Sequence, residues 1–326
     1  MRSLRLPARP AWLVALALAA VANPIAAQEL FVSNEGSNTV TVVSAETLAP
    51  LATIQVGKRP RGIALSPDGR RIYVALGQDD AVEVIDVAKR AVVDTLPVGP
   101  DPEQVAVSAD GKVVYVSNES AARSTGVRVS DHHQLFSVAV GKEPEGVAVT
   151  PDGRRVFVTG ESDSSVTILD AKTGQVLRTL HVAARPRFVT FDKTGDRAFV
   201  SSEAGGTLSI VDIRRDSVLA VVHIGDGTTR PTGVALAPDG RRLYVANGAA
   251  SRITVIDPIA ARVVSSIPVG NRPWGVALSS DGKTLYSADG RSNQISVIDT
   301  ASGRLRATVS VGERPYSLVI VPRSGP

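Results

Sequence analysis

The chain of 326 residues contains no cysteine. Cysteine supplies disulfides, thiolate metal ligands and thiol nucleophiles, so the sequence excludes all three. It also excludes a lipid anchor on an N-terminal cysteine. The folded chain must therefore be held together by burial and hydrogen bonding, without covalent cross-links.

Histidine is almost as scarce, with only four in the chain: His132, His133, His181 and His223. The first two lie near a predicted turn and the others on predicted outer strands, away from the candidate acids described below. A histidine pair can bind a transition metal at a surface, but we expect no metal site and no cofactor. No HExxH, GxSxG, P-loop or Rossmann glycine pattern occurs, so metalloprotease, elbow-serine, nucleotide-hydrolysis and hydride-transfer chemistry have no sequence support.

The N-terminus has the composition of a secretory signal peptide. Three arginines precede an apolar run from Ala11 to Val21, and small residues follow before Gln28. The apolar run is too short to span a bilayer as a helix, so we expect no membrane span. We predict cleavage after Ala27, which makes residues 1–27 the signal peptide and places the mature chain in the periplasm or outside the cell.

Removal of the leader changes the charge balance. The chain holds 36 basic and 32 acidic residues, and three of the arginines lie in the leader, which leaves 33 against 32 and a net charge of +1. Aromatic residues make up only 4% of the chain. Nucleic-acid binding requires a surplus of positive charge, and single strands also need aromatic stacking surfaces, so a nucleic-acid partner is not expected.

Proline marks an internal repeat. Seven prolines recur at intervals of 42, 42, 42, 45, 42 and 42 residues: Pro60, Pro102, Pro144, Pro186, Pro231, Pro273 and Pro315. A period of about 40 to 45 residues with four strand-like runs is typical of a β-propeller, a solenoid or an array. In the unit that follows Pro60, we predict strands at Gly62 to Leu65, Ile72 to Leu76, Val82 to Ile85 and Val92 to Val98.

The two ends of the repeat complement each other. The last unit contains only one strand, Tyr316 to Val321, and the three missing strands match the segment from Leu30 to Gly57. The sequence therefore predicts an all-β, seven-bladed β-propeller of four-stranded antiparallel blades, whose last blade joins N- and C-terminal strands. We expect residues 28–326 to form a single domain and a monomer.

Several strings carry a resemblance to a known family. YVSN (115–118) and YVAN (244–247), each followed by a VID or related strand, resemble the YVTN family of bacterial propeller repeats. Longer strings, GKRPRGIALSPDGRRIYV, VGPDPE, GKEPEGVAVTPDG, ARPRF and SSEAGGTLSIVDI, resemble the exported propellers associated with pyrroloquinoline quinone-dependent catabolism. The similarity covers nearly all of residues 29 to 322. It implies a periplasmic accessory protein, with a quinoprotein dehydrogenase or a cytochrome as partner and no established catalytic residues.

The residues that flank the repeated prolines differ in charge from unit to unit. The residue before each proline is Arg59, Asp101, Glu143, Arg185, Arg230, Arg272 or Arg314, and the residue after it is Arg61, Glu103, Glu145, Arg187, Thr232, Trp274 or Tyr316. On a closed ring, two adjacent units supply an acidic arc and the others a basic arc with aromatic residues. Arginine forks bind carboxylates and phosphates, so all these residues except Thr232 form a candidate site for a small anionic ligand. The alternative is structural ion pairing of Arg61 with Glu103 and of Arg187 with Glu145.

A second set of acids lies between the second and third strands of four units: Glu35, Glu119, Glu161 and Glu203. With Glu103 and Glu145 they could surround a hard cation such as Ca²⁺, which prefers oxygen ligands. No metal-binding spacing supports this, so we expect them to be solvated loop acids.

Three functions follow from these observations. The first is a non-catalytic binding or scaffold protein, accessory to periplasmic quinoprotein oxidation. The second is a hydrolase similar to the seven-bladed lactonases, in which Glu103 and Glu145 activate water and Arg187 stabilises the oxyanion. The third, a binder of single-stranded nucleic acid, is disfavoured by the net charge. We expect the first.

Overall fold

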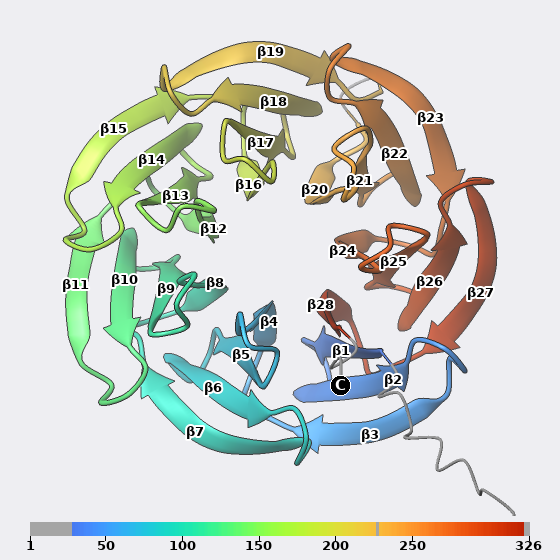
Figure 1. Cartoon of the computed structure of the whole chain (residues 1–326), viewed down its shortest axis with the longest axis horizontal. Helices are drawn as coiled ribbons and strands as arrows, with labels where there is room; N and C mark the ends of the chain where they lie inside the picture. Colours follow the sequence, from blue (N-terminus) through green and yellow to red (C-terminus); the bar gives the residue numbers. More distant parts are fainter. Residues whose placement is uncertain (1–27, 226–227, 323–326) are drawn as a thin grey trace, which may run out of the picture.

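The computed structural model describes residues 28–225 and 228–322, and all regular structure in this part of the chain is β. Its strands form seven four-stranded sheets around a central axis, as Figure 1 shows. None of the described residues form a helix able to cross a membrane. The predicted leader and its cleavage after Ala27 lie outside the described residues.

Six blades follow one another along the chain, and a seventh joins its two ends. Blade 1 contains β4 (Pro60–Leu65), β5 (Arg71–Leu76), β6 (Ala81–Asp86) and β7 (Ala91–Pro97). Blade 2 contains β8 (Pro102–Val107), β9 (Val113–Asn118), β10 (Arg123–Arg128) and β11 (Gln134–Ala139). Blade 3 contains β12 (Pro144–Val149), β13 (Arg155–Gly160), β14 (Ser165–Asp170) and β15 (Val176–His181).

The remaining blades repeat this order from the axis to the rim. Blade 4 contains β16 (Pro186–Phe191), β17 (Arg197–Ser202), β18 (Thr207–Asp212) and β19 (Ser217–His223). Blade 5 contains β20 (Pro231–Leu236), β21 (Leu243–Asn247), β22 (Arg252–Asp257) and β23 (Arg262–Pro268). Blade 6 contains β24 (Pro273–Leu278), β25 (Thr284–Asp289), β26 (Gln294–Asp299) and β27 (Arg304–Ser310). Blade 7 contains β28 (Pro315–Val321), β1 (Glu29–Asn34), β2 (Thr39–Ser44) and β3 (Pro50–Gln55).

The inner strand of each blade begins at the repeated proline, two residues before the predicted start. In blade 1, Pro60 pairs with Leu76, and the register shifts before Ile63 pairs with Val74. Proline lacks a backbone N–H and is tolerated as the first residue of a strand. The residue after the proline, Arg61 in this blade, therefore belongs to the strand nearest the axis and not to a loop.

The residue before each proline adopts the left-handed backbone conformation, with φ between 48° and 59° in all seven units. Its carbonyl accepts a hydrogen bond from the backbone N–H of the residue that follows the second strand, such as Gly77 N–H to Arg59 O at 3.0 Å. The other six units repeat this bond. Two loops of every blade are thus joined on one face of the propeller.

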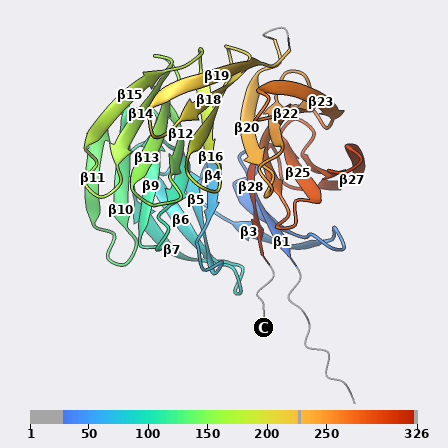
Figure 2. The same ribbon diagram turned by 45° about the horizontal axis from the view of Figure 1, so that its top comes forward.

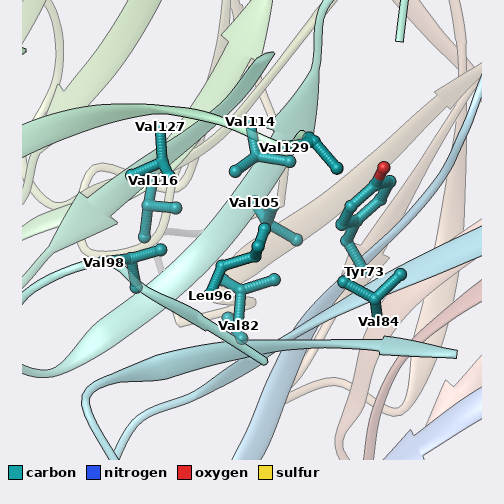
Figure 3. Close-up of a cluster of buried hydrophobic side chains, with 11 residues drawn as sticks. Tyr73, Val82, Val84, Leu96, Val98, Val105, Val114, Val116, Val127 and Val129 are labelled. Carbon is teal, nitrogen blue, oxygen red and sulfur yellow. The ribbon is translucent and has the colours of Figure 1, made fainter. Parts of the chain in front are cut away.

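Apolar side chains fill the space between neighbouring blades. Figure 3 shows one such cluster, in which Val82 and Leu96 of blade 1 pack against Val105, Val114 and Val116 of blade 2. A cluster of this kind lies at each of the seven blade interfaces. Burial of these apolar side chains is the main interaction that holds neighbouring blades together.

The ring closes as the sequence predicts. Strand β28 pairs antiparallel with β1, from Val321 opposite Glu29 to Ser317 opposite Ser33. Figure 1 shows β28 as the innermost strand of blade 7, and in Figure 2 the described chain ends beside β1. The Ser33 hydroxyl also donates a hydrogen bond of 2.6 Å to the backbone carbonyl of Arg61, which joins blade 7 to blade 1.

Deletion of residues 313 to 326 tests the closure. The deletion removes β28 with its buried Leu318 and Val321 and exposes the inner edge of β1. At about 1.5–3 kcal/mol for each buried side chain, we expect a loss of roughly 4 kcal/mol or more and of the cooperative calorimetric transition. An unchanged melting curve would contradict the role of β28.

Candidate functional site

The face that carries the joined loops is called the channel mouth. Three sets of residues surround the axis there: the outer ring before the prolines, the inner ring after them, and the loop ring that follows each second strand. The loop ring consists of Glu35, Gly77, Glu119, Glu161, Glu203, Gly248 and Gly290. The structure therefore places all the candidate site residues of the sequence around one opening, although their contacts differ between blades.

Arg187 is the centre of an ion-pair network between blades 3 and 4. Its guanidinium contacts Glu145, lies 2.6 Å from Glu161 and donates through Nε to Glu203, also at 2.6 Å. The Arg187 side chain is 10% exposed and that of Glu203 only 2%. Arg185 of the outer ring also contacts Glu161. Three carboxylates are therefore buried around one cation.

Blades 1 and 2 form a second network. Arg61 lies 2.6 Å from one carboxylate oxygen of Glu103, and Arg59 lies 2.7 Å from the other and 2.6 Å from Asp101. The Glu103 contacts are close ion pairs without good hydrogen-bond angles, and its carboxylate is fully buried. The Arg61 guanidinium also lies 4.3 Å from the ring centre of Tyr316. The two ion pairs suggested by the sequence, Arg61 with Glu103 and Arg187 with Glu145, are both present.

The acids of the loop ring do not form a cation cage. Among the described residues, the one acidic group with ligand-like spacing is Asp101, Glu103 and Glu119, whose oxygens lie within 4.8 Å of one another. The Arg59 guanidinium lies 2.6 to 3.7 Å from these acids and supplies the positive charge. The expectation of solvated loop acids is wrong for Glu161 and Glu203, which are buried against arginine.

Burial shifts the ionisation of the inner-ring acids. It raises the pKa of Glu145 to about 7, although Arg187 and Arg61 act in the opposite direction. It also raises the pKa of Glu103, although the guanidinium groups of Arg61 and Arg59 favour the charged carboxylate. Glu145 thus has the pKa of a group that exchanges protons near neutral pH.

A small pocket lies on the axis at the inner ring. It is lined by Glu145, Arg187, Thr232, Trp274 and Tyr316, together with Gln104, Phe188, Ser317 and two glycines. The space open to water is about 30 Å³, enough for one or two water molecules. Glu103 does not line this pocket, so only Glu145 of the two inner-ring acids faces it.

The side of the mouth formed by blades 5 and 6 carries positive charge that is only weakly compensated. The Arg230 side chain is 51% exposed, and its guanidinium lies 3.6 Å from the carboxylate of Glu203. Arg272 lies 3.9 Å from Glu203 and 4.6 Å from the ring centre of Trp274. Burial lowers the pKa of Arg272, and the nearby cation Arg291 lowers it further. These arginines and Trp274 offer a surface for an anion with a flat body.

Apart from Arg230, Arg272 and Trp274 on the basic side, three candidate residues form no ion pair in either network. Glu143 is exposed and accepts a hydrogen bond from the Ser162 hydroxyl. Arg314 is exposed. The ring of Tyr316 is tilted by 33° to that of Trp274, with 5.2 Å between ring centres, and Tyr316 lines the axial pocket.

The sequence did not identify Thr232 as a site residue. It stands at the inner-ring position of blade 5, where its neighbours in the ring are charged or aromatic. Its hydroxyl donates to the Trp274 carbonyl at 3.1 Å and its side chain lines the pocket. The sequence contained one signal for this role, because Thr232 directly follows a repeated proline as the other inner-ring residues do.

Two protein-family models match parts of the chain. Residues 179–321 match "Lactonase, 7-bladed beta-propeller", and residues 25–135 match "Cytochrome D1 heme domain". Each covers less than half of the chain. No curated protein matches it.

Solved structures share the fold over most of the chain. Kuenenia stuttgartiensis hydrazine synthase is 24% identical, with a TM-score of 0.76, over 84% of this chain and 92% of its own. A candidate 6-phosphogluconolactonase of Bacteroides fragilis is 19% identical, with a TM-score of 0.78, over 90% and 98%. Another from Bacteroides uniformis is 19% identical, with a TM-score of 0.77, over 90% and 99%.

The mouth does not fit a haem group. Haem iron is held by histidine, cysteine, methionine or tyrosine. Among the described residues, no histidine or methionine lines the axial pocket, and the ring of Tyr316 is covered by Arg61 and Trp274. We derive no chemistry through haem.

These findings overturn the expectation of a non-catalytic scaffold accessory to quinoprotein oxidation. The match over residues 179–321 is to a lactonase family model, which supports the alternative of a hydrolase better than the scaffold. Glu145 of the inner ring also lines a space of about 30 Å³ that is open to water.

Replacement of Arg187 by methionine tests the network. Without the guanidinium, Glu145, Glu161 and Glu203 lose their shared cation while they stay buried. We expect a loss of about 3–5 kcal/mol in the free energy of unfolding at pH 7, measured by urea denaturation. The matched variant Arg230→Met, at an exposed mouth position, is expected to change it by less than about 0.5 kcal/mol. Equal effects of the two variants would show that the burial of Arg187 is unimportant.

Proposed function

We propose that the protein hydrolyses a lactone at the channel mouth. The observation that carries the proposal is the axial pocket, in which Glu145 and Arg187 face a space of the size of a water molecule. The lactonase family match over residues 179–321 supports the same reaction. The fold alone does not decide it, because propellers serve many functions.

The residues of the pocket have complementary roles in this reaction. Glu145, with a pKa of about 7, accepts a proton from water, whose oxygen attacks the lactone carbonyl carbon. The Arg187 guanidinium stabilises the oxyanion that forms. The bond between the carbonyl carbon and the ring oxygen then breaks. The proton on Glu145 passes to the ring oxygen, and the product is a hydroxy acid.

The basic side of the mouth favours a lactone that carries a negative charge. Arg230 and Arg272 are 3.6 and 3.9 Å from their acidic partner Glu203, and Arg272 lies 4.6 Å from the ring centre of Trp274. An arginine fork binds a carboxylate or a phosphate in a defined orientation. We propose that this side holds such a substituent while the ring of the substrate lies over the axial pocket.

The proposed cellular location of the protein and its proposed metabolic context rest on sequence patterns. The N-terminal pattern supports export to the periplasm or beyond the cell. The repeat strings support a link to pyrroloquinoline quinone-dependent catabolism. Oxidation of a cyclic hemiacetal yields a lactone, so we propose a quinoprotein dehydrogenase as the source of the substrate. Genes for such a dehydrogenase and a cytochrome beside this one would support the link.

Replacement of Glu145 by glutamine tests the reaction. On a panel of lactones, we expect the wild-type protein to release acid, and kcat/KM to rise with pH around a midpoint near 7 as Glu145 loses its proton. Glu145→Gln removes the base, so we expect kcat/KM to fall by about 100-fold or more. A pH-stat assay measures both.

The matched control is Glu313→Gln, an exposed acid of the same face that lies outside the proposed machinery. It is expected to retain full activity. The proposal fails if the wild-type protein turns over no lactone on the panel, or if Glu145→Gln is as active as the control.

Replacement of Arg272 by glutamine tests the preference for charge. For lactones with a carboxylate or phosphate substituent, we expect KM to rise by about tenfold, because one charge-assisted hydrogen bond is lost. For neutral lactones of the same ring size, we expect little change. An equal rise in KM for charged and neutral substrates would show that Arg272 does not bind the anionic substituent.

A further inference from the structure

A second cavity lies between blades 4 and 5, on the face opposite the channel mouth. The turns that connect β16 to β17, β20 to β21 and β22 to β23 surround it. The space open to water is about 680 Å³, within the range of small-molecule sites. Its apolar walls include Phe191, Phe199, Leu236 and Ile259. Ile259 is 74% exposed, the highest value among the exposed large apolar side chains of the described residues.

Arg197 provides the positive charge of this crevice. Its guanidinium donates to the backbone carbonyl of Pro258 at 3.5 Å, the limit of a hydrogen bond. No carboxylate within the described ranges forms an ion pair with it. A half-buried guanidinium with one long contact retains most of its capacity to bind an anion.

The preceding interface shows which partner is missing. Between blades 3 and 4, the equivalent Arg155 donates to the Ile213 carbonyl at 3.0 Å and pairs with Asp216 at 2.9 Å. The position of Asp216 corresponds to Ala261 in the next blade. Both residues have a positive φ, 47° and 49°, so the backbone is alike and only the carboxylate is absent.

We propose that this crevice binds a small amphiphilic carboxylate. The carboxylate takes the place that Asp216 occupies beside Arg155 and pairs with Arg197. The apolar body of the ligand lies on Phe191, Phe199 and Ile259. This site is separate from the channel mouth and does not depend on the proposed hydrolysis.

The charges of the surrounding turns are compatible with an anion. Lys193 adds a positive charge to the lining. Asp192 accepts the backbone N–H groups of Asp196 and Arg197, at 2.8 and 3.2 Å. Asp239 accepts the N–H of Arg241 at 2.9 Å. Both lining carboxylates are therefore engaged with their own turns.

Decanoate is the probe for this site, with binding measured by isothermal titration calorimetry on the mature protein. We expect the wild-type protein to bind it, and Arg197→Gln to weaken binding by about tenfold or more, because a charged hydrogen-bond partner is lost. Ala261→Asp supplies the missing carboxylate. It is expected to weaken binding equally, while the melting temperature stays the same or rises.

Two controls separate this site from other cationic positions. Arg155→Gln removes the equivalent arginine of the closed interface, and Arg272→Gln removes a cation of the channel mouth; both are expected to bind decanoate as the wild type does. Ala261→Asp is also expected to retain any lactone turnover, so the two proposals can fail separately. The proposal is overturned if the wild type gives no binding heat, if Arg197→Gln and Ala261→Asp bind normally, or if Arg272→Gln abolishes binding.

Discussion

The ion pairs of Arg187 with Glu145, Glu161 and Glu203 are the interaction on which the channel mouth depends. Three carboxylates from two blades are buried beside one another, which their mutual repulsion and desolvation would oppose without a shared cation. The same burial keeps the pKa of Glu145 near neutrality. The burial of this ion-pair network therefore determines both the packing at the axis and the ionisation of Glu145.

The architecture could be predicted because a repeated sequence repeats its geometry. Proline spacing gave seven blades, and the incomplete last unit predicted the pairing of β28 with β1. The start of each inner strand was placed two residues late, because the register shift after Pro60 cannot be recognised from alternation alone. The left-handed conformation before each proline was also not apparent, since residues such as Arg59 and Glu143 seldom adopt it.

The sequence predicts which residues lie near one another at the channel mouth, and that they form a ligand site stays a prediction. Equivalent positions of a closed repeat must form a ring, so the residues beside the prolines lie on one face of the propeller. The partners of Arg187 were not predicted, because the burial of Glu161 and Glu203 depends on distances between blades that sequence spacing does not contain. The expectation of a scaffold failed for a related reason: repeat strings specify a fold, while function resides in the residues that differ between repeats.

The central claim is that burial in an arginine network makes Glu145 a base that acts near neutral pH. The most direct test is a ¹³C NMR titration of the glutamate side-chain carboxyl groups, with the Glu145 signal assigned by its absence in the glutamine variant. The account predicts a midpoint near 7 for that signal. A midpoint at the ordinary glutamate value of about 4.3 would contradict it.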